Sequence, residues 1–326
     1  MYAYGGARAV LATVLFCTFA GSALAQEPPF PKKGPIEITV LFPAGSSADV
    51  AARLLADGMS KQLGQTVVVF NRPGAGGAIG YKHVASQKPD GYSLVWNSNS
   101  VSTTYHSGQL PFNYESFDAV AQVLVESPVL AVRAESKFKT LADIIAAAKA
   151  QPKTITIANS GTGSHTHFVA VALFKAAGAE VIDVPFGAAQ VIPSMLGGQV
   201  DAGVQLPAAL AGNVKSGQMR LLASMTAKRD PAFPEVPTAR ELKLDVALEL
   251  WRGIAVPKGT PKPVIAALEG AIRKTVASKE FAEGSDKLGA RPAFLSASDF
   301  GKVVAKEDAE ILKLMTILGM KKSAER

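Results

Sequence analysis

The chain has 326 residues, and its 34 Lys or Arg against 27 Asp or Glu give a formal net charge of +7 at pH 7. These basic residues are scattered, and no stretch combines a basic run with aromatic side chains, so the excess charge does not indicate nucleic-acid binding. The one cysteine, Cys17, lies within the first 25 residues. The remainder therefore has no disulfide and no cysteine-based metal site.

The first 25 residues have the pattern of a secretory signal. Arg8 supplies a positive charge, an uncharged apolar run covers 9–20, and Ala23-Leu24-Ala25 forms an A-x-A site before Gln26. We therefore predict an exported protein that is cleaved after Ala25. No run of 18 apolar residues follows this segment, so no transmembrane helix is predicted in the mature chain.

Apolar, β-rich runs alternate with helical patterns after the signal, which predicts an α/β fold with parallel sheets covered by helices. In the first part, strands are predicted at 36–42, 66–70 and 92–96, and helices at 48–63 and 79–86. Strands at 120–126 and 129–133 follow each other too closely for a helix to lie between them. The chain is therefore predicted to cross to a second domain at this point.

A helix at 141–150 opens the second domain, with Thr140 as its N-cap and Asp143 three residues later, close to a capping box. Strands are then predicted at 154–158, 180–184, 200–205 and 220–225, with helices starting at 165, 188 and 206. A run at 249–256 is the predicted return crossing, followed by a helix at 264–278, a strand at 288–295 and a helix at 297–318. Two crossings predict a discontinuous first domain, 26–125 and 254–326, around a second domain, 126–253.

One strand–loop–helix motif occurs twice along the chain: in each copy, a strand leads into a Gly/Ser loop that is followed directly by a helix. The loops are 43–47 and 159–164. The first N–H groups of a helix are unpaired and carry partial positive charge, so each loop could hold an anion. Two such loops facing each other would hold a small dianion. The alternative for the first loop is an ordinary turn with Ser47 as helix N-cap.

Other patterns that could indicate chemistry are less specific. Gly74–Gly80 lacks the third glycine of G-x-G-x-x-G, which falls on Ile79, so it predicts tight strand–helix packing and not a nucleotide site. His165 and His167 are two apart, so on a helix they point in opposite directions and cannot chelate a metal. A secreted hydrolase using Ser164 and His165 would lack a third orienting group. We therefore predict no enzyme, no metal and no cofactor.

Several motifs recur in order over nearly all of the mature chain: 42–49 with Arg53, 71–80, 89–92, 110–112, 161–163 with His167, 196–201 and 234–238. Together they resemble the Bug-type extracytoplasmic receptors of tripartite tricarboxylate transporters. The resemblance implies a two-lobed Venus flytrap, like a type II periplasmic binding protein, with two crossover strands and the ligand between the lobes. It also implies a monomeric periplasmic receptor that delivers a carboxylate to integral membrane transporter subunits. A ligand-sensing partner of a membrane sensor kinase would share the same site.

In that family the two loops hold one ligand carboxylate, partly through ordered water. Carried over to this sequence, with neighbouring strand ends, the candidate ligand-binding residues are Ala44, Gly45, Ser46, Ser47, Asp49, Asn97, Ser98, Ser160, Gly161, Thr162, Gly163, Ser164, His165, Phe186, Gly187 and Gln205. The favoured ligand is a dicarboxylate, aliphatic or aromatic, although tricarboxylates and amidated or uncharged ligands stay open.

For three residues the sequence supports a more specific prediction. His165 stands where the family commonly has a small hydroxyl residue, so we expect it to contact the ligand or narrow the cleft. If it donates to an anion, its charged form is favoured. Trp96 replaces a more usual aliphatic residue of the family. Like His165, it indicates a ligand whose distal end differs from that of other family members. Asp49, with Arg53 four residues later, is expected to brace the first loop.

Overall fold

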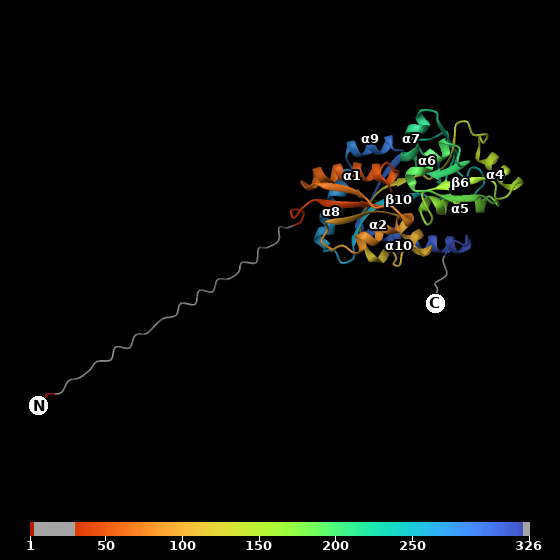
Figure 1. Ribbon diagram of the computed structural model, residues 1–326. Coiled ribbons are helices and arrows are strands. Elements are labelled where there is room, and N and C mark those ends of the chain that lie inside the picture. Colours follow the sequence, from red (N-terminus) through yellow and green to blue (C-terminus); the bar gives the residue numbers. More distant parts are fainter. Residues whose placement is uncertain (3–29, 322–326) are drawn as a thin grey trace.

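The computed structural model describes residues 30–321, together with Met1 and Tyr2, so the predicted signal segment and its cleavage site lie outside the described residues. Two β-sheets, each covered by helices, build two lobes side by side (Figure 1). The predicted two-lobed α/β class is confirmed. None of the helices described is long and apolar enough to cross a bilayer.

The first lobe is built on a six-stranded sheet. Its strand order is β11 (Ala290–Leu295), β4 (Phe117–Glu126), β10 (Leu250–Pro257), β3 (Ser93–Ser98), β1 (Ile36–Val40) and β2 (Val67–Asn71). The strands β2, β1 and β3 are parallel, whereas β10 pairs antiparallel with β3 and β4, and β11 antiparallel with β4. The expectation of wholly parallel sheets is therefore wrong. The chain leaves this lobe along β4 and returns along β10, so these neighbours run in opposite directions.

Helices cover both faces of the first sheet. On one face lie α1 (Ser47–Leu63), α8 (Lys262–Val276) and α9 (Lys279–Lys287), whose buried side chains form one core with Ile36, Ile38 and Val40 of β1. On the other face lie α2 (Ala78–Ala85), α3 (Ser100–His106) and α10 (Ala297–Ile317). The alternation of side chains along each strand supplies apolar residues to both cores.

The second lobe is built on a five-stranded sheet. Its order is β7 (Ile182–Pro185), β6 (Thr156–Asn159), β8 (Ala202–Gln205), β5 (Val129–Arg133) and β9 (Met219–Ser224). One face is covered by α4 (Leu141–Ala150) and α5 (His165–Ala176), the other by α6 (Ala188–Leu196) and α7 (Pro207–Lys215). The predicted capping box of α4 is present, because Thr140 and Asp143 each accept from the backbone of the other.

Three segments connect the lobes. Ser127 and Pro128 join β4 to β5, and residues 225–249 lead from β9 back to β10. The third segment is α10, which begins on the first sheet and continues beneath α5 of the second lobe (Figure 1). There Ile311 and Met315 pack on Phe168 in a small apolar cluster of their own. At 21 residues, α10 is long enough to bridge both lobes.

Candidate functional site

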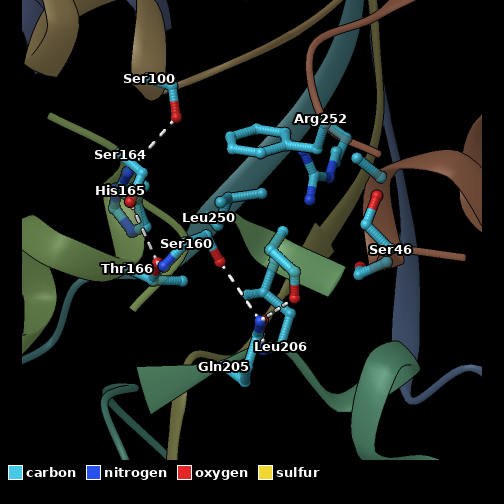
Figure 2. Close-up of a pocket in the computed structure, with 14 residues that line it drawn as sticks. Ser46, Ser100, Ser160, Ser164, His165, Thr166, Gln205, Leu206, Leu250 and Arg252 are labelled. Atoms are coloured by element: carbon cyan, nitrogen blue, oxygen red, sulfur yellow. Dashed lines mark hydrogen bonds between the residues drawn. The ribbon is translucent and has the colours of Figure 1, made fainter. Parts of the chain in front are cut away.

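The two strand–loop–helix motifs meet at the junction between the lobes. Ser46 caps α1 by accepting from the Asp49 amide at 3.4 Å, and Ser164 caps α5 by accepting from the His167 amide at 3.2 Å. The alternative with Ser47 as N-cap is wrong, because Ser46 has the extended backbone of a cap and Ser47 is the first helical residue. Figure 2 shows Ser46 on one side and Ser160, Ser164 and His165 on the opposite side of a cavity.

This cavity is small, with a volume of about 20 Å³, and is lined by residues from both lobes and from the crossing strand β10. Six of the lining residues are sequence-predicted: Ser46, Ser47, Ser160, Ser164, His165 and Gln205. Eight others complete the wall: Phe42, Ala48, Ser100, Thr166, Ala188, Leu206, Leu250 and Arg252. Hydroxyl and amide groups thus surround a space that also has an apolar side.

Hydrogen bonds hold the two lobes together over this cavity. Thr103 Oγ1 donates to the Gly163 carbonyl at 2.7 Å, and Gln109 Nε2 donates to the Thr162 carbonyl at 2.6 Å. A Cβ added at Gly76 would lie 2.6 Å from the same Thr162 oxygen. Gly76 therefore allows the backbones of the two lobes to approach. Thr162 and Gly163, predicted as ligand contacts, form the closed seam between the lobes and do not line the cavity.

A second hollow adjoins the cavity and shares Phe42, Ser160 and Ala188 with it. Three further predicted residues, Gly161, Phe186 and Gly187, lie in the wall of this hollow. Its opposite wall is the glycine-rich segment 73–77. The predicted loop 74–80 does pack closely on its own lobe, since a Cβ at Gly80 would lie 2.7 Å from Leu41 Cδ2, but its first residues also face the second lobe.

Asp49 braces the first loop and does not line the cavity. Its carboxylate accepts from the Gly45 amide at 3.0 Å and from Asn71 Nδ2 at 2.9 Å, and pairs with Arg53 at 2.8 Å. Burial raises the pKa of Asp49, but these hydrogen bonds and the Arg53 charge outweigh it and hold the pKa below its ordinary value. Ala44 and Gly45 belong to the same braced turn and are not part of the cavity wall.

Asn97 and Ser98 lie within the first lobe and outside the cavity wall. Asn97 Oδ1 accepts from the Tyr81 hydroxyl at 2.8 Å and from the Ser98 amide at 2.9 Å. Trp96 is fully buried in the core shared with α1. The expectation that Trp96 shapes the ligand end is wrong, because strand alternation turns its side chain toward α1.

His165 lines the cavity as a buried, neutral ring. Its Nε2 lies 3.1 Å from the Leu248 carbonyl, which can only accept, so Nε2 carries the hydrogen. Burial lowers the pKa of His165 to about 4; the Leu248 carbonyl opposes this shift and the Arg252 charge adds to it. His165 is therefore neutral in this structure, and its ring lines the cavity; a contact between His165 and the ligand stays a prediction.

His167 supports the second loop. Its Nδ1 accepts from the Gly163 amide at 3.2 Å, and its Nε2 lies 3.2 Å from Asp183 Oδ2. Over the residues that the structure describes, no group of three or more His, Cys, Asp or Glu side chains is placed to hold a metal ion.

A buried ion pair beside the cavity was not predicted from the sequence. Arg252 Nε donates to Glu126 Oε2 at 2.7 Å, and their side chains are 2% and 0% exposed. Ser47 Oγ donates to the other carboxylate oxygen of Glu126. A signal existed in the sequence, since each is a charged residue inside the apolar run of a crossing strand.

The fold and the cavity define a class, the two-lobed solute-binding proteins of the periplasmic binding protein type. Within it, the model of the tripartite tricarboxylate transporter family receptor matches residues 51–320, and the chain belongs to this family. The family is one of substrate-binding receptors and not of enzymes.

Solved structures agree with this assignment. The periplasmic binding protein BugD is 30% identical, with a TM-score of 0.85 over 89% of this chain and 99% of that one. MatC from Rhodopseudomonas palustris with bound malate is 25% identical, with a TM-score of 0.81 over 87% and 99%. R. palustris Rpa4515 with adipate is 26% identical, with a TM-score of 0.84 over 89% and 98%.

Proposed function

We propose that this chain is a periplasmic receptor that captures a small carboxylate between its lobes and delivers it to the membrane subunits of a tripartite tricarboxylate-type transporter. The observation that carries the proposal is the cavity between the N-termini of α1 and α5, walled by residues of both lobes. Malate and adipate, bound by two structural relatives, support a carboxylate as the ligand class. No cofactor is needed, and the receptor acts as a monomer.

The wall chemistry suits a small organic acid. Ser46, Ser100, Ser160 and Thr166 supply hydroxyl groups, while Phe42, Leu206 and Leu250 supply apolar surface for a carbon skeleton. Hydrogen bonds to a charged group contribute about 1.5–3 kcal/mol each, so a few of them approach the −8 kcal/mol of a micromolar complex. A dicarboxylate, aliphatic or aromatic, is the ligand that the sequence favours.

A thermal-shift screen tests the proposal. The panel contains straight-chain mono- and dicarboxylates of two to eight carbons, malate, citrate and simple aromatic acids, each beside its primary amide. An acid present at 100 times its Kd adds about 2.7 kcal/mol to the free energy of unfolding, so we expect at least one acid to raise the Tm by roughly 4 °C or more. A panel in which no acid raises the Tm would contradict the carboxylate receptor.

A further inference from the structure

The backbone of the two loops has fewer donors for an anion than the sequence pattern implied. In the second loop the amides of Ser160, Gly161, Gly163 and Ser164 all donate to groups of the same lobe. The His165 amide donates to Ser100 Oγ across the lobe junction at 3.4 Å. In the first loop the Gly45 and Ser46 amides are used by Asp49 and Pro43. A carboxylate in the cavity is therefore left with the first-turn amides of α1 and α5 and with the side chains of the wall.

Among the side chains of the wall, Arg252 carries a buried donor that is unpaired. Its side chain is 2% exposed, and its Nη1 is buried with no hydrogen-bond partner among the described residues. Of the fourteen residues that line the cavity, Arg252 is the one with a formal charge, because His165 is neutral. Figure 2 shows its guanidinium between Leu250 and Ser46, with the nitrogen atoms directed toward the middle of the cavity.

Glu126 fixes the direction of that donor. It accepts from Arg252 Nε at 2.7 Å and also from Ser47 Oγ, so both carboxylate oxygens are engaged. The two residues lie on neighbouring strands, with Leu250 directly opposite Glu126 in the β4–β10 register. A planar guanidinium held at Nε presents its remaining N–H groups in a fixed fork, which suits a carboxylate.

We infer that Arg252 binds a carboxylate of the ligand through Nη1, and that Glu126 is the positioning residue that aims it into the cavity. This inference rests on the proposed function and identifies Arg252 as the residue that mainly determines the ligand selectivity of the receptor. The receptor then prefers an acid to the amide of the same skeleton.

Charge balance limits the cavity to one carboxylate. The charges of Arg252 and Glu126 cancel, and the N-termini of α1 and α5 contribute about half a positive charge each. One carboxylate balances these helix ends, whereas a second would leave an uncompensated charge in an enclosed space. The other end of a dicarboxylate therefore extends into the adjoining hollow beside Phe186 and Gly187.

The test compares acid and amide binding in matched variants. Arg252→Gln combined with Glu126→Gln removes both buried charges together, because removing one partner alone leaves the other unpaired. The control is Arg229→Gln with Glu241→Gln, an exposed pair within the connecting segment 225–249. Affinities are measured by calorimetry for the acid that gives the largest shift in the panel and for its primary amide.

We expect the cavity double variant to lose about 10- to 100-fold in acid affinity while amide affinity stays close to wild type, so that the acid preference collapses. The surface double variant should keep the wild-type preference. A folded cavity variant with an unchanged acid-to-amide ratio would overturn the role of Arg252 and leave the receptor function intact. Binding of no panel acid to the wild type would overturn both.

A second measurement does not depend on the variants folding. In a crystal structure of the wild-type protein with the same acid, a carboxylate oxygen should lie within about 3.2 Å of Arg252 Nη1. A carboxylate bound elsewhere in the cleft, with Nη1 not in contact with it, would overturn the inference.

Discussion

At the scale of single residues, polar groups are buried where the chain passes between the lobes. Glu126 ends β4, Arg252 lies near the start of β10, and His165 begins α5 against Leu248 of the returning segment. Each of these side chains is at most 2% exposed. Burial of polar groups is costly unless they are paired, so their concentration at this one place supports the proposed ligand site.

His165 gives a pH-dependent stability whose sign follows from its neutral state. Its pKa is about 4 in the folded protein and 6.5 ordinarily, so between these values the unfolded chain binds a proton that the folded protein rejects. Stability should therefore fall as pH is lowered from 6.5 toward 4. We expect His165→Gln to remove on the order of 2 kcal/mol of this loss.

Urea unfolding at pH 7 and pH 5 measures the effect, with His83→Gln, at a partly exposed histidine of α2, as the control. Identical pH slopes in wild type and His165→Gln would show that His165 is not buried as a neutral ring. Since His165 is already neutral, acid affinity in the wild type should not decrease between pH 6.5 and 8 on its account.

Part of the site was predictable from the sequence, and the missing part has a physical reason. Ser46, Ser160 and Ser164 were found because strand, Gly/Ser loop and helix start are local patterns. Arg252 and Glu126 were missed because their meaning depends on a pairing between strands that are more than a hundred residues apart. The titration of His165 also depends on its burial, which a sequence does not reveal.

At the scale of elements, α10 holds the crossing strand β10 of the first lobe through a titratable residue. Glu307 on α10 accepts from Asn99 Nδ2 and from Trp251 Nε1, each at 2.6 Å. Burial raises the pKa of Glu307 to about 7, with the charges of Glu310 and Glu249 adding to the shift and the two donors opposing it. Trp251 lies on β10, directly beside Arg252, so this contact supports the crossing strand.

The raised pKa of Glu307 makes stability depend on pH with the opposite sign to His165. Between pH 4.5 and about 7 the folded protein holds a proton that the unfolded chain has lost, so stability falls as pH rises through this range. Glu307→Gln should remove this loss, on the order of 2 kcal/mol between pH 5 and pH 8. Parallel urea unfolding at both pH values checks it, with the exposed Glu283→Gln as control. A wild-type slope that survives in Glu307→Gln would contradict the assignment.

Elements were predictable where their apolar pattern is strong. The helix at 141–150 and the strand at 129–133 have their predicted bounds, and the helix at 188–196 begins where it was predicted to begin. The short α3 and the charged α9 were not predicted, because the first has few apolar residues and the second only Phe281 as a fully buried apolar residue. The contact of α10 with the second lobe was not predicted. The apolar residues near the end of this helix continue the same amphipathic pattern as those near its start, so the sequence does not show which lobe they contact.

At the scale of the whole molecule, the sequence predicted two α/β lobes and two crossings, and the two sheets agree with this. The division at 26–125, 126–253 and 254–326 stays a prediction. The strand β10 begins at Leu250, inside the predicted return crossing at 249–256 and four residues before the predicted domain boundary. Sheet direction was not predictable, since whether a returning strand runs parallel or antiparallel is decided by the place where it enters the sheet. The closed seam between the lobes is likewise a tertiary feature.

That seam requires glycine at position 76. Its φ is +63°, and an added Cβ would meet the backbone oxygen of Thr162 in the other lobe, which cannot move unless the lobes separate. Gly178 is the matched control, with a φ of +62° and open space around it. Both Gly→Ala substitutions should lose about 1–2 kcal/mol to left-handed strain, but only Gly76→Ala should oppose closure.

Small-angle scattering therefore tests the central claim, that a carboxylate is captured between two lobes that close on it. On saturation with the best acid of the panel, the radius of gyration of the wild type and of Gly178→Ala should fall, because contacts from both loops require closure. Gly76→Ala should bind the acid more weakly and stay more open. An unchanged wild-type radius under conditions where calorimetry shows the acid to be bound would contradict the account.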